Sequence, residues 1–454
     1  MKENVFSLDL SAYDGSWVRR EEDGCWALEN VVTCAHALRP DLQSINLYVP
    51  LAYRRGGSVG GWDAATAPIV LRNCVGGYSE CSPEPLDDFG RECLAAGLVY
   101  VTAGARGKQT TDESGRFIGK SPIGLVDLKA AVRFLKHNAD KLPGNPYRIL
   151  STGVSAGGAM SSLLGVTGNA PEYLPMLQEA GAALDVGDDV FAAQCYCPII
   201  DLEHADAGYE WMFDGVTAYK GIGEGELDAF SQALSAELKK IYIEYFNSLA
   251  LRHPQTGAPL TLNPDGRSGS GYDYLMQVVR QAAQAGGSAW IPQELDDLYQ
   301  GYLTRLKPCP SFDSITYNNP ETQEFGDETT NYRHFSPDVA RALEALQAQF
   351  PEQYAQHHDA YALSRTDEAL IRRRALIDPF RCIDAGHAAG WAPHFRVRVG
   401  TRDPHTSFTM AMILATKLRN AGHPDVDYAM VWGRDHCAAD VPGGFVAWAQ
   451  RIAR

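Results

Sequence analysis

The sequence predicts an α/β fold, a mostly parallel, doubly wound sheet whose chain is interrupted by a large, mainly helical insertion. Two observations predict it. Short apolar and β-branched runs alternate with helical patterns over residues 1–204 and again over 391–454, as in a parallel sheet covered on both faces. Over residues 205–390, strand patterns give way to long helical ones. The length of 454 residues supports this division, because it exceeds what one compact core normally holds.

The strands of the first segment are expected where apolar, β-branched residues cluster. A helix is expected between the third and fourth strands, because apolar residues recur at steps of three and four from Leu125 to Leu135 and so share one helical face. Pro143-Gly144 then turns the chain into the next strand. The predicted strands are 44–49, 68–72, 98–102, 147–151 and 191–197.

The insertion is expected to consist of helices, and the segment after it returns to strands. One helix start is well marked, since Ser336 is a favourable N-cap and Pro337 suits the first turn. The predicted insertion helices are 227–249, 272–285, 292–306 and 338–350. A strand at 395–399, a helix at 407–420, a strand at 426–431 and a last helix are predicted to follow.

The most informative motif lies where the fourth predicted strand ends. Residues Gly153 to Gly157 read G-x-S-x-G between an apolar run and a helical run, which is the pattern of a nucleophile elbow. The sharp turn strains the backbone of the central serine, so the positions two before and two after it must lack colliding side chains. Ser155 is therefore the predicted nucleophile. Gly56–Gly60 matches the same string, but neither a strand nor a helix flanks it, so Ser58 is predicted to lie in a surface loop.

A serine hydroxyl needs a base to take its proton and an acid to orient that base. On a sheet of this kind the three residues follow in chain order serine, acid, histidine, with the last two on loops after the final strands. Asp403 follows the strand at 395–399, and His436 follows the strand at 426–431. Asp435 is the rival acid, but as the immediate neighbour of His436 it would struggle to reach the far ring nitrogen. The predicted triad is Ser155, Asp403 and His436.

The oxyanion of a tetrahedral intermediate needs backbone N–H donors. One normally comes from the residue after the nucleophile, here Ala156, and the other from a glycine-rich turn after an early strand. Val75-Gly76-Gly77-Tyr78 offers such a turn, and Gly77 is the predicted second donor. A simple turn with no catalytic part is an equal alternative for this glycine pair.

The bulk composition excludes several classes of partner. A formal net charge of −16 with scattered Lys and Arg argues against nucleic acid or an anionic membrane. The N-terminus has no signal-peptide pattern and no 18-residue apolar stretch occurs, so the chain is expected to be cytoplasmic. The ten cysteines are not spaced as a disulfide framework and are expected to be free thiols. Neither C-x-x-C nor H-E-x-x-H occurs, so no metal or other cofactor is predicted.

Several segments together resemble bacterial tannases of the lactobacillus type (subtype B). The similarity covers nearly the whole chain, the insertion included, and the Cys-Pro-Ile to Glu-Trp block is more specific than the elbow. These segments are Thr66–Val70, Val75–Tyr78, the elbow, Tyr196–Asp206, Tyr209–Trp211 and Phe325–Asp327. The resemblance implies an α/β-hydrolase with a catalytic domain at 1–204 and 391–454 and a lid at 205–390, a serine esterase that cleaves galloyl esters of small polyphenols.

The resemblance also implies site residues. The family triad falls on Ser155, Asp403 and His436, in agreement with the reasoning from the elbow. A lysine and a glutamate that bind the hydroxyls of the galloyl ring match Lys307 and Glu321. An isoleucine of the family that touches the ring matches Ile199.

Two positions depart from related enzymes. The third ring-binding residue of the family is an aspartate two positions after the triad acid, and His405 stands there instead. A neutral imidazole can accept or donate a hydrogen bond but carries no negative charge, so His405 is expected to change the selectivity for gallate. Fungal tannases and feruloyl esterases carry a disulfide between cysteines flanking the serine and the histidine. Here Cys437 follows the histidine but Val154 precedes the serine, so that bridge cannot form.

Two other functions stay open on the sequence. The first is a feruloyl-type or general carboxylesterase, or a peptidase, because fold alone does not fix the substrate. The second is a catalytically inactive hydrolase fold used as a binding module. The complete set of serine, aspartate and histidine argues against this alternative.

Overall fold

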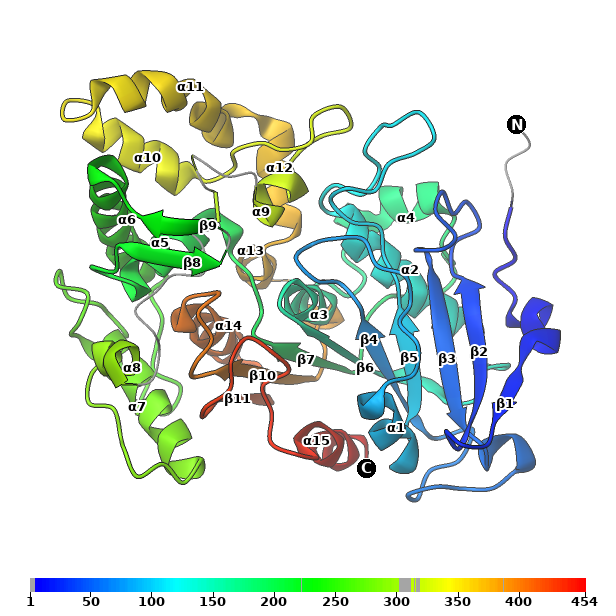
Figure 1. The fold of residues 1–454 in the computed structure, drawn as a ribbon. Helices are drawn as coiled ribbons and strands as arrows, with labels where there is room; N and C mark the ends of the chain where they lie inside the picture. Colours follow the sequence, from blue (N-terminus) through cyan, green and yellow to red (C-terminus); the bar gives the residue numbers. More distant parts are fainter. Residues whose placement is uncertain (1–4, 222, 302–311, 314, 316–318, 387) are drawn as a thin grey trace. The chain divides into compact units, whose positions relative to one another are not determined.

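The structure, a computed structural model, describes residues 5–221, 223–301, 312–313, 315, 319–386 and 388–454 (Figure 1). The chain divides into two compact units. The first consists of 1–195, 385–396 and 440–454, and the second of 196–384 and 397–439. The predicted nucleophile thus belongs to the first unit, and the predicted acid and base belong to the second.

Nine strands form a sheet in the order β1-β2-β3-β5-β4-β6-β7-β10-β11. The four strands β1, β2, β3 and β5 pair with one another in antiparallel fashion, whereas β4 pairs in parallel with both β5 and β6. The strands are β1 (Val18–Arg20), β2 (Cys25–Val32), β3 (Ser44–Pro50), β4 (Pro68–Asn73), β5 (Val99–Ala103), β6 (Asn145–Val154), β7 (Ala192–Tyr196), β10 (His394–Gly400) and β11 (Val426–Val431).

The first unit encloses its strands between helices. Buried side chains of α1 and α15 pack with Tyr48, Val70 and Tyr100 in one apolar cluster, and α2 and α3 lie on the opposite side of the strands (Figure 1). Burying one large apolar side chain stabilises a fold by about 1.5–3 kcal/mol, so a strand covered on both faces is held firmly. The helices are α1 (Asp88–Ala95), α2 (Ile123–His137), α3 (Ala156–Val166), α4 (Leu174–Ala180) and α15 (Gly444–Ala453), with 3-10 turns at Leu10–Ser16, Tyr53–Arg55, Pro171–Tyr173 and Ala388–Gly390.

The second unit is mainly helical. Helix α5 packs on α6, and α10 packs on α5, α6 and α11. Besides β11 and most of β10, the unit contains a short antiparallel pair, β8 (Ala218–Gly221) and β9 (Gly223–Glu226). The helices are α5 (Leu202–Met212), α6 (Ala229–Ser248), α7 (Ser270–Ala285), α8 (Leu295–Gly301), α9 (Pro320–Glu324), α10 (Pro337–Leu346), α11 (Pro351–Thr366), α12 (Glu368–Leu376), α13 (Pro379–Asp384) and α14 (Phe408–Asn420).

The seven predicted strands all occur, and the fold-class prediction of a helix-covered, mostly parallel sheet is confirmed. Ser336 caps α10 as predicted, accepting a hydrogen bond from the Val339 N–H at 3.2 Å. The part of the predicted helix 292–306 beyond Gly301 lies outside the described residues. The predicted division into a domain at 1–204 and 391–454 and an insertion at 205–390 stays a prediction.

Among the described residues, no helix combines the length and the apolar character needed to span a membrane. No disulfide joins the cysteines that the structure describes, and Cys195 and Cys197 are buried.

Candidate active site

The turn between β6 and α3 has the strained geometry expected of an elbow. Ser155 stands between strand and helix with φ 62° and ψ −124°, a conformation that L-residues rarely adopt. A Cβ on Gly153 would lie 2.4 Å from the Gly157 carbonyl oxygen, and a Cβ on Gly157 would lie 2.8 Å from the Val75 carbonyl oxygen. Both approaches are too close for any side chain, so these two positions require glycine. Ser58, by contrast, lies exposed and outside helix and strand, as predicted.

Asn73, at the end of β4, holds the elbow in place, and the sequence motifs did not single it out. Its side chain is buried, and Nδ2 donates to the carbonyl oxygens of Thr152 at 3.1 Å and Gly157 at 3.0 Å. Nδ2 also lies 3.2 Å from Ser161 Oγ. Asn73 thus ties together the strand before Ser155 and the helix after it. Backbone strain of this kind persists only when surrounding contacts enforce it.

The turn that holds Gly77 lies beside the elbow. Gly77 and Tyr78 both have positive φ, 52° and 55°. Lys108 fixes this turn, because its Nζ donates to the Gly77 carbonyl oxygen at 2.6 Å and its N–H donates to the Tyr78 carbonyl oxygen at 2.9 Å. Ala156 is the first residue of α3, so its N–H has no intrahelical acceptor. The oxyanion-binding role of Gly77 and Ala156 stays a prediction.

The second unit brings Asp403 and His436 together. The loops after β10 and β11 are joined by hydrogen bonds from the Thr401 N–H to the Val431 carbonyl oxygen at 3.0 Å and from the Arg402 N–H to the Arg434 carbonyl oxygen at 2.9 Å. Across these loops His436 Nδ1 lies 2.8 Å from Asp403 Oδ2.

Asp403 is fully buried, whereas the rival Asp435 is exposed and pairs with Arg402 instead. A buried carboxylate on Nδ1 leaves the other ring nitrogen available as a base.

His405 lies against the same histidine. The ring centroids of His405 and His436 are 4.6 Å apart and tilted by 38°. The His405 N–H donates to Asp403 Oδ1 at 2.9 Å. Partial burial of the ring, together with the neighbouring His436, lowers the pKa of His405, so the ring is neutral at neutral pH.

Cys197 is a further member of this cluster that the sequence analysis missed. It is fully buried in the segment after β7, and its backbone has a positive φ of 34°. Its Sγ donates to the Cys437 carbonyl oxygen at 3.2 Å, in the loop that carries His436. Nothing in the local sequence reveals this contact, because it joins residues far apart in the chain.

The remaining predicted ring contacts are placed individually. Ile199 is buried in the segment that follows β7, and Glu321 is buried in the first turn of α9. Lys307 lies outside the described residues. The contacts of Ile199 and Glu321 with an aromatic ring stay predictions.

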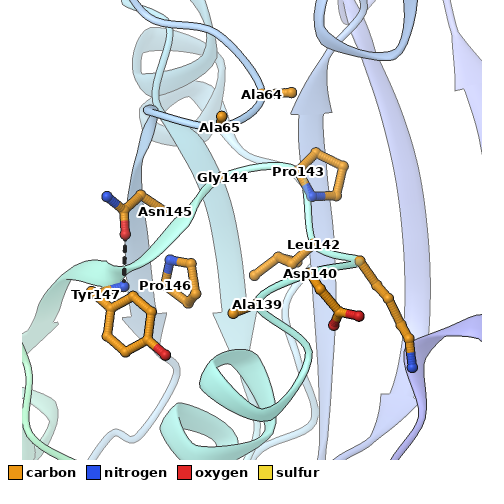
Figure 2. A pocket seen from close by; sticks show the side chains of 11 residues that line it. Ala64, Ala65, Ala139, Asp140, Leu142, Pro143, Gly144, Asn145, Pro146 and Tyr147 are labelled. Atoms are coloured by element: carbon orange, nitrogen blue, oxygen red, sulfur yellow. Dashed lines mark hydrogen bonds between the residues drawn. The ribbon is translucent and has the colours of Figure 1, made fainter.

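A cavity of about 490 Å³ in the first unit is distinct from the elbow (Figure 2). It is lined by residues at the start of β6 and the loop before it, among them Leu142, Asn145 and Tyr147. Ser155 follows the opposite end of this ten-residue strand, roughly 30 Å away at about 3.3 Å per residue. This cavity is therefore not the place of ester chemistry.

Comparison with known proteins defines the class. A family model described as BD-FAE matches residues 118–191, which include the elbow. The carboxylesterase NlhH of Mycobacterium tuberculosis is 31% identical over 99 residues, and the match spans 31% of that protein and 21% of this chain. Together with the sheet and the elbow, these partial matches indicate an α/β-hydrolase fold and relate the chain to carboxylic ester hydrolases.

Solved structures narrow the class to one family. The native tannin acyl hydrolase of Lactobacillus plantarum has a TM-score of 0.84 and 33% identity, over 95% of this chain and 94% of that one. The tannase of Fusobacterium nucleatum has a TM-score of 0.82 and 31% identity, over 95% of each chain. A tannin acyl hydrolase in complex with ethyl gallate has a TM-score of 0.82 and 33% identity, over 95% of this chain and 94% of that one. The chain belongs to the tannase family, which confirms the resemblance noted in the sequence.

Proposed function

We propose that this chain is a serine esterase that hydrolyses galloyl and related hydroxybenzoyl esters through an acyl-enzyme intermediate, with Ser155, Asp403 and His436 as its triad. The observation that carries the proposal is the 2.8 Å contact between His436 Nδ1 and the buried Asp403. The strained Ser155 at the elbow supports it, and a related tannin acyl hydrolase with bound ethyl gallate supports the choice of substrate.

In the proposed reaction His436 acts first as a base. Its Nε2 takes the proton of Ser155 as the hydroxyl oxygen attacks the ester carbonyl carbon. Asp403 fixes the tautomer of His436 and stabilises the imidazolium that forms. His436 then returns the proton to the departing alcohol, which leaves a galloyl ester on Ser155. A water molecule, activated by the same histidine, hydrolyses this ester and releases the acid.

The proposed oxyanion donors are the N–H groups of Ala156 and Gly77. Ala156 opens α3, so its N–H adds the positive end of the helix dipole to the hydrogen bond. The hold of Lys108 on the Gly77 carbonyl oxygen supports this role, because it orients the turn before substrate arrives.

The proposed ring pocket consists of Lys307, Glu321, Ile199 and His405. A trihydroxyphenyl group that leaves water needs polar partners for its hydroxyls, and each unmatched bond costs about 1–3 kcal/mol. We retain the assignment of 1–204 and 391–454 to a catalytic domain and of 205–390 to a lid as part of this proposal. The proposed partner is a small polyphenol ester, and a cytoplasmic location stays a prediction.

The nucleophile is tested by Ser155→Ala with Ser58→Ala as the matched control. Ser155→Ala should lose about a millionfold in turnover of methyl gallate, the usual consequence of removing such a serine. Ser58→Ala should keep the parent rate, because Ser58 lies exposed outside any helix or strand. Rapid-quench trapping of a galloyl adduct on Ser155 gives a readout independent of rate. Loss of activity in Ser58→Ala alone would reassign the nucleophile.

The substrate class is tested with methyl gallate, methyl protocatechuate, methyl ferulate, methyl benzoate and a p-nitrophenyl ester. kcat/KM should be highest for methyl gallate, and methyl benzoate should be poor because it leaves polar pocket groups unpaired. A preference for ferulate or plain benzoate would reject the galloyl proposal and leave the esterase assignment standing. Failure of every ester would favour the inactive binding module.

A further inference from the structure

We propose that Cys197, Asp403 and His436 form a binding site for a soft divalent cation, with Zn²⁺ as the reference ion, and that the bound ion reversibly inhibits the esterase. The binding claim depends only on the second unit, whereas the inhibition claim rests on the proposed function of Asp403 and His436. Such an ion would differ from a structural or catalytic metal, because its occupancy would oppose the proposed reaction.

The geometry of the cluster carries the proposal. The thiol sulfur, one carboxylate oxygen and one imidazole nitrogen all lie within 4.8 Å of one another. Among the residues that the structure describes, no other group of at least three His, Cys, Asp or Glu side chains meets this condition. A tetrahedral zinc ion with ligands at about 2.0–2.3 Å holds neighbouring ligand atoms roughly 3.5 Å apart, so the widest pair must close by at most about 1.3 Å.

The ligands are held in place before any ion arrives. Cys197 and Asp403 are fully buried, and Asp403 also accepts from the His405 N–H at 2.9 Å. The Cys197 thiol already reaches the His436 loop through its hydrogen bond to the Cys437 carbonyl oxygen. Little side-chain entropy is therefore lost when the three groups converge on one ion.

The donor set selects the class of ion. Thiolate and imidazole favour Zn²⁺, Cd²⁺ or Co²⁺ over Mg²⁺ and Ca²⁺, which prefer oxygen ligands. On binding, the Cys197 S–H bond breaks, a sulfur–metal bond forms and the proton passes to buffer. A neutral His436 gives a lone pair to the metal, and water fills the fourth position. No oxidant or reductant is involved.

Inhibition follows from which groups the ion occupies. Asp403 would no longer orient His436, and an imidazole bound to a metal cannot accept the proton of Ser155. The inhibition should therefore be released by a chelator and should strengthen as pH rises, because metal binding releases a proton.

The binding test uses Co²⁺, whose thiolate charge-transfer absorption reports a sulfur ligand directly. The titration is made on the full-length Ser155→Ala variant, with Cys197→Ser and Cys437→Ser each added to it. The absorption should appear in the Ser155→Ala protein. It should persist when Cys437→Ser is added, because Cys437 contacts Cys197 through its backbone carbonyl oxygen. It should be absent with Cys197→Ser. His436→Gln should weaken Co²⁺ binding by at least about tenfold. Even the loss of a residue that only hydrogen-bonds to a ligand lowers metal affinity by about this factor.

The inhibition test measures methyl gallate turnover in buffered free Zn²⁺, each variant normalised to its own metal-free rate. Cys197→Ser should raise the half-inhibitory concentration by at least about tenfold relative to the parent, and Cys437→Ser should not. Equal inhibition of the parent and Cys197→Ser, or no charge-transfer band in the Ser155→Ala protein, would overturn the site. A normal band without inhibition would overturn the inhibition claim and count against the proposed roles of Asp403 and His436. Circular dichroism verifies folding, and if Cys197→Ser does not fold, His436→Gln decides the binding claim.

Discussion

At the scale of single residues, the neighbour of His436 in the chain is not its partner in space. Asp435 is exposed and pairs with Arg402, whereas Asp403 is buried at 2.8 Å from His436 Nδ1. Asp403→Asn should therefore lose about 10⁴ in turnover, because the asparagine favours the wrong tautomer. Asp435→Asn should stay near the parent rate. The measurement is kcat for methyl gallate, and the reverse ranking would make Asp435 the acid.

His405 stands where the sequence resemblance leads one to expect an aspartate. A carboxylate at this position would accept hydrogen bonds from ring hydroxyls more strongly than a neutral imidazole. His405→Asp should raise kcat/KM for methyl gallate by about tenfold, or about 1.4 kcal/mol, and should change methyl 4-hydroxybenzoate less. Because the pKa of His405 is lowered, protonation should alter the parent enzyme only below the usual histidine range. Equal effects on both esters would mean that His405 does not face the ring hydroxyls.

The sequence revealed residues that follow a motif and missed residues that act across the fold. The strained turn at Ser155 and the contact between Asp403 and His436 could be predicted, because the elbow and the ends of two strands mark these positions. Asn73 and Cys197 could not, since each acts through hydrogen bonds to segments far away in the chain. The only local signal for Asn73 was a polar residue at the end of a strand. Such residues are too common for this position to predict a role at the elbow.

At the scale of elements, the same limit applies to strands. Strands buried on both faces, such as β3 and β4, were predictable from their apolar runs. The missed β2 has a register shift between Leu28 and Val31, and Asn30 there has a positive φ, so the polar and apolar alternation is broken. The pair β8 and β9 consists largely of glycine and charged residues, which resemble a loop.

The junction of β6 and α3 gives a prediction at this scale. Alanine is normally better than glycine within a helix, by about 1 kcal/mol. At Gly157, however, a Cβ would lie 2.6 Å from Asn73 Oδ1 and 2.8 Å from the Val75 carbonyl oxygen. Gly157→Ala should therefore lower the free energy of unfolding by about 1–3 kcal/mol and reduce kcat by displacing the elbow.

The matched control for this variant is Gly15→Ala, because a Cβ on Gly15 would meet nothing within 4 Å. Urea denaturation and kcat for methyl gallate are measured on both. If Gly157→Ala is as stable and as active as Gly15→Ala, the elbow is not as tightly held as the contacts of Asn73 imply.

At the scale of the whole molecule, the two units differ in how they bury charge. In the first unit, each buried carboxylate that the structure describes forms an ion pair with lysine or arginine. Asp127 pairs with Arg106 at 2.7 Å, and Asp188 pairs with Lys129 at 2.8 Å and Arg133 at 2.7 Å. Breaking such a pair by removing one partner costs about 3–5 kcal/mol, because the other charge stays buried alone.

The second unit instead gathers titratable groups around one histidine. His204 Nδ1 lies 2.8 Å from Asp338 Oδ2, and its ring stacks on Tyr245 at 3.7 Å between centroids. Burial disfavours the imidazolium, but the nearby carboxyl groups, with Asp338 hydrogen-bonded directly, outweigh it and raise the pKa of His204 to about 9. The other charged or titratable groups around this histidine are Asp201, Glu203, Asp378 and Arg381.

This cluster predicts how stability depends on pH. The folded pKa of His204 exceeds the ordinary value of 6.5, so its contribution is complete below pH 6.5 and is lost as pH rises through about 9. The free energy of unfolding should thus fall over this window by up to about 3 kcal/mol, since one pKa unit corresponds to about 1.4 kcal/mol. His204→Asn keeps a donor for Asp338 but cannot titrate, so its stability should change less between pH 6.5 and pH 9.

The measurement is urea denaturation of the parent, His204→Asn and the control His358→Asn at both ends of this window. His358 lies on α11 of the same unit and is partly exposed beside Asp359, so it is the matched histidine control. Burial raises the pKa of Asp378 to about 6, so the stability that it contributes is present at low pH and is lost as pH rises to about 6, below the window of the comparison. A parent whose stability is flat between pH 6.5 and pH 9, or an equal slope in His204→Asn, would mean that His204 carries no buried positive charge in this window.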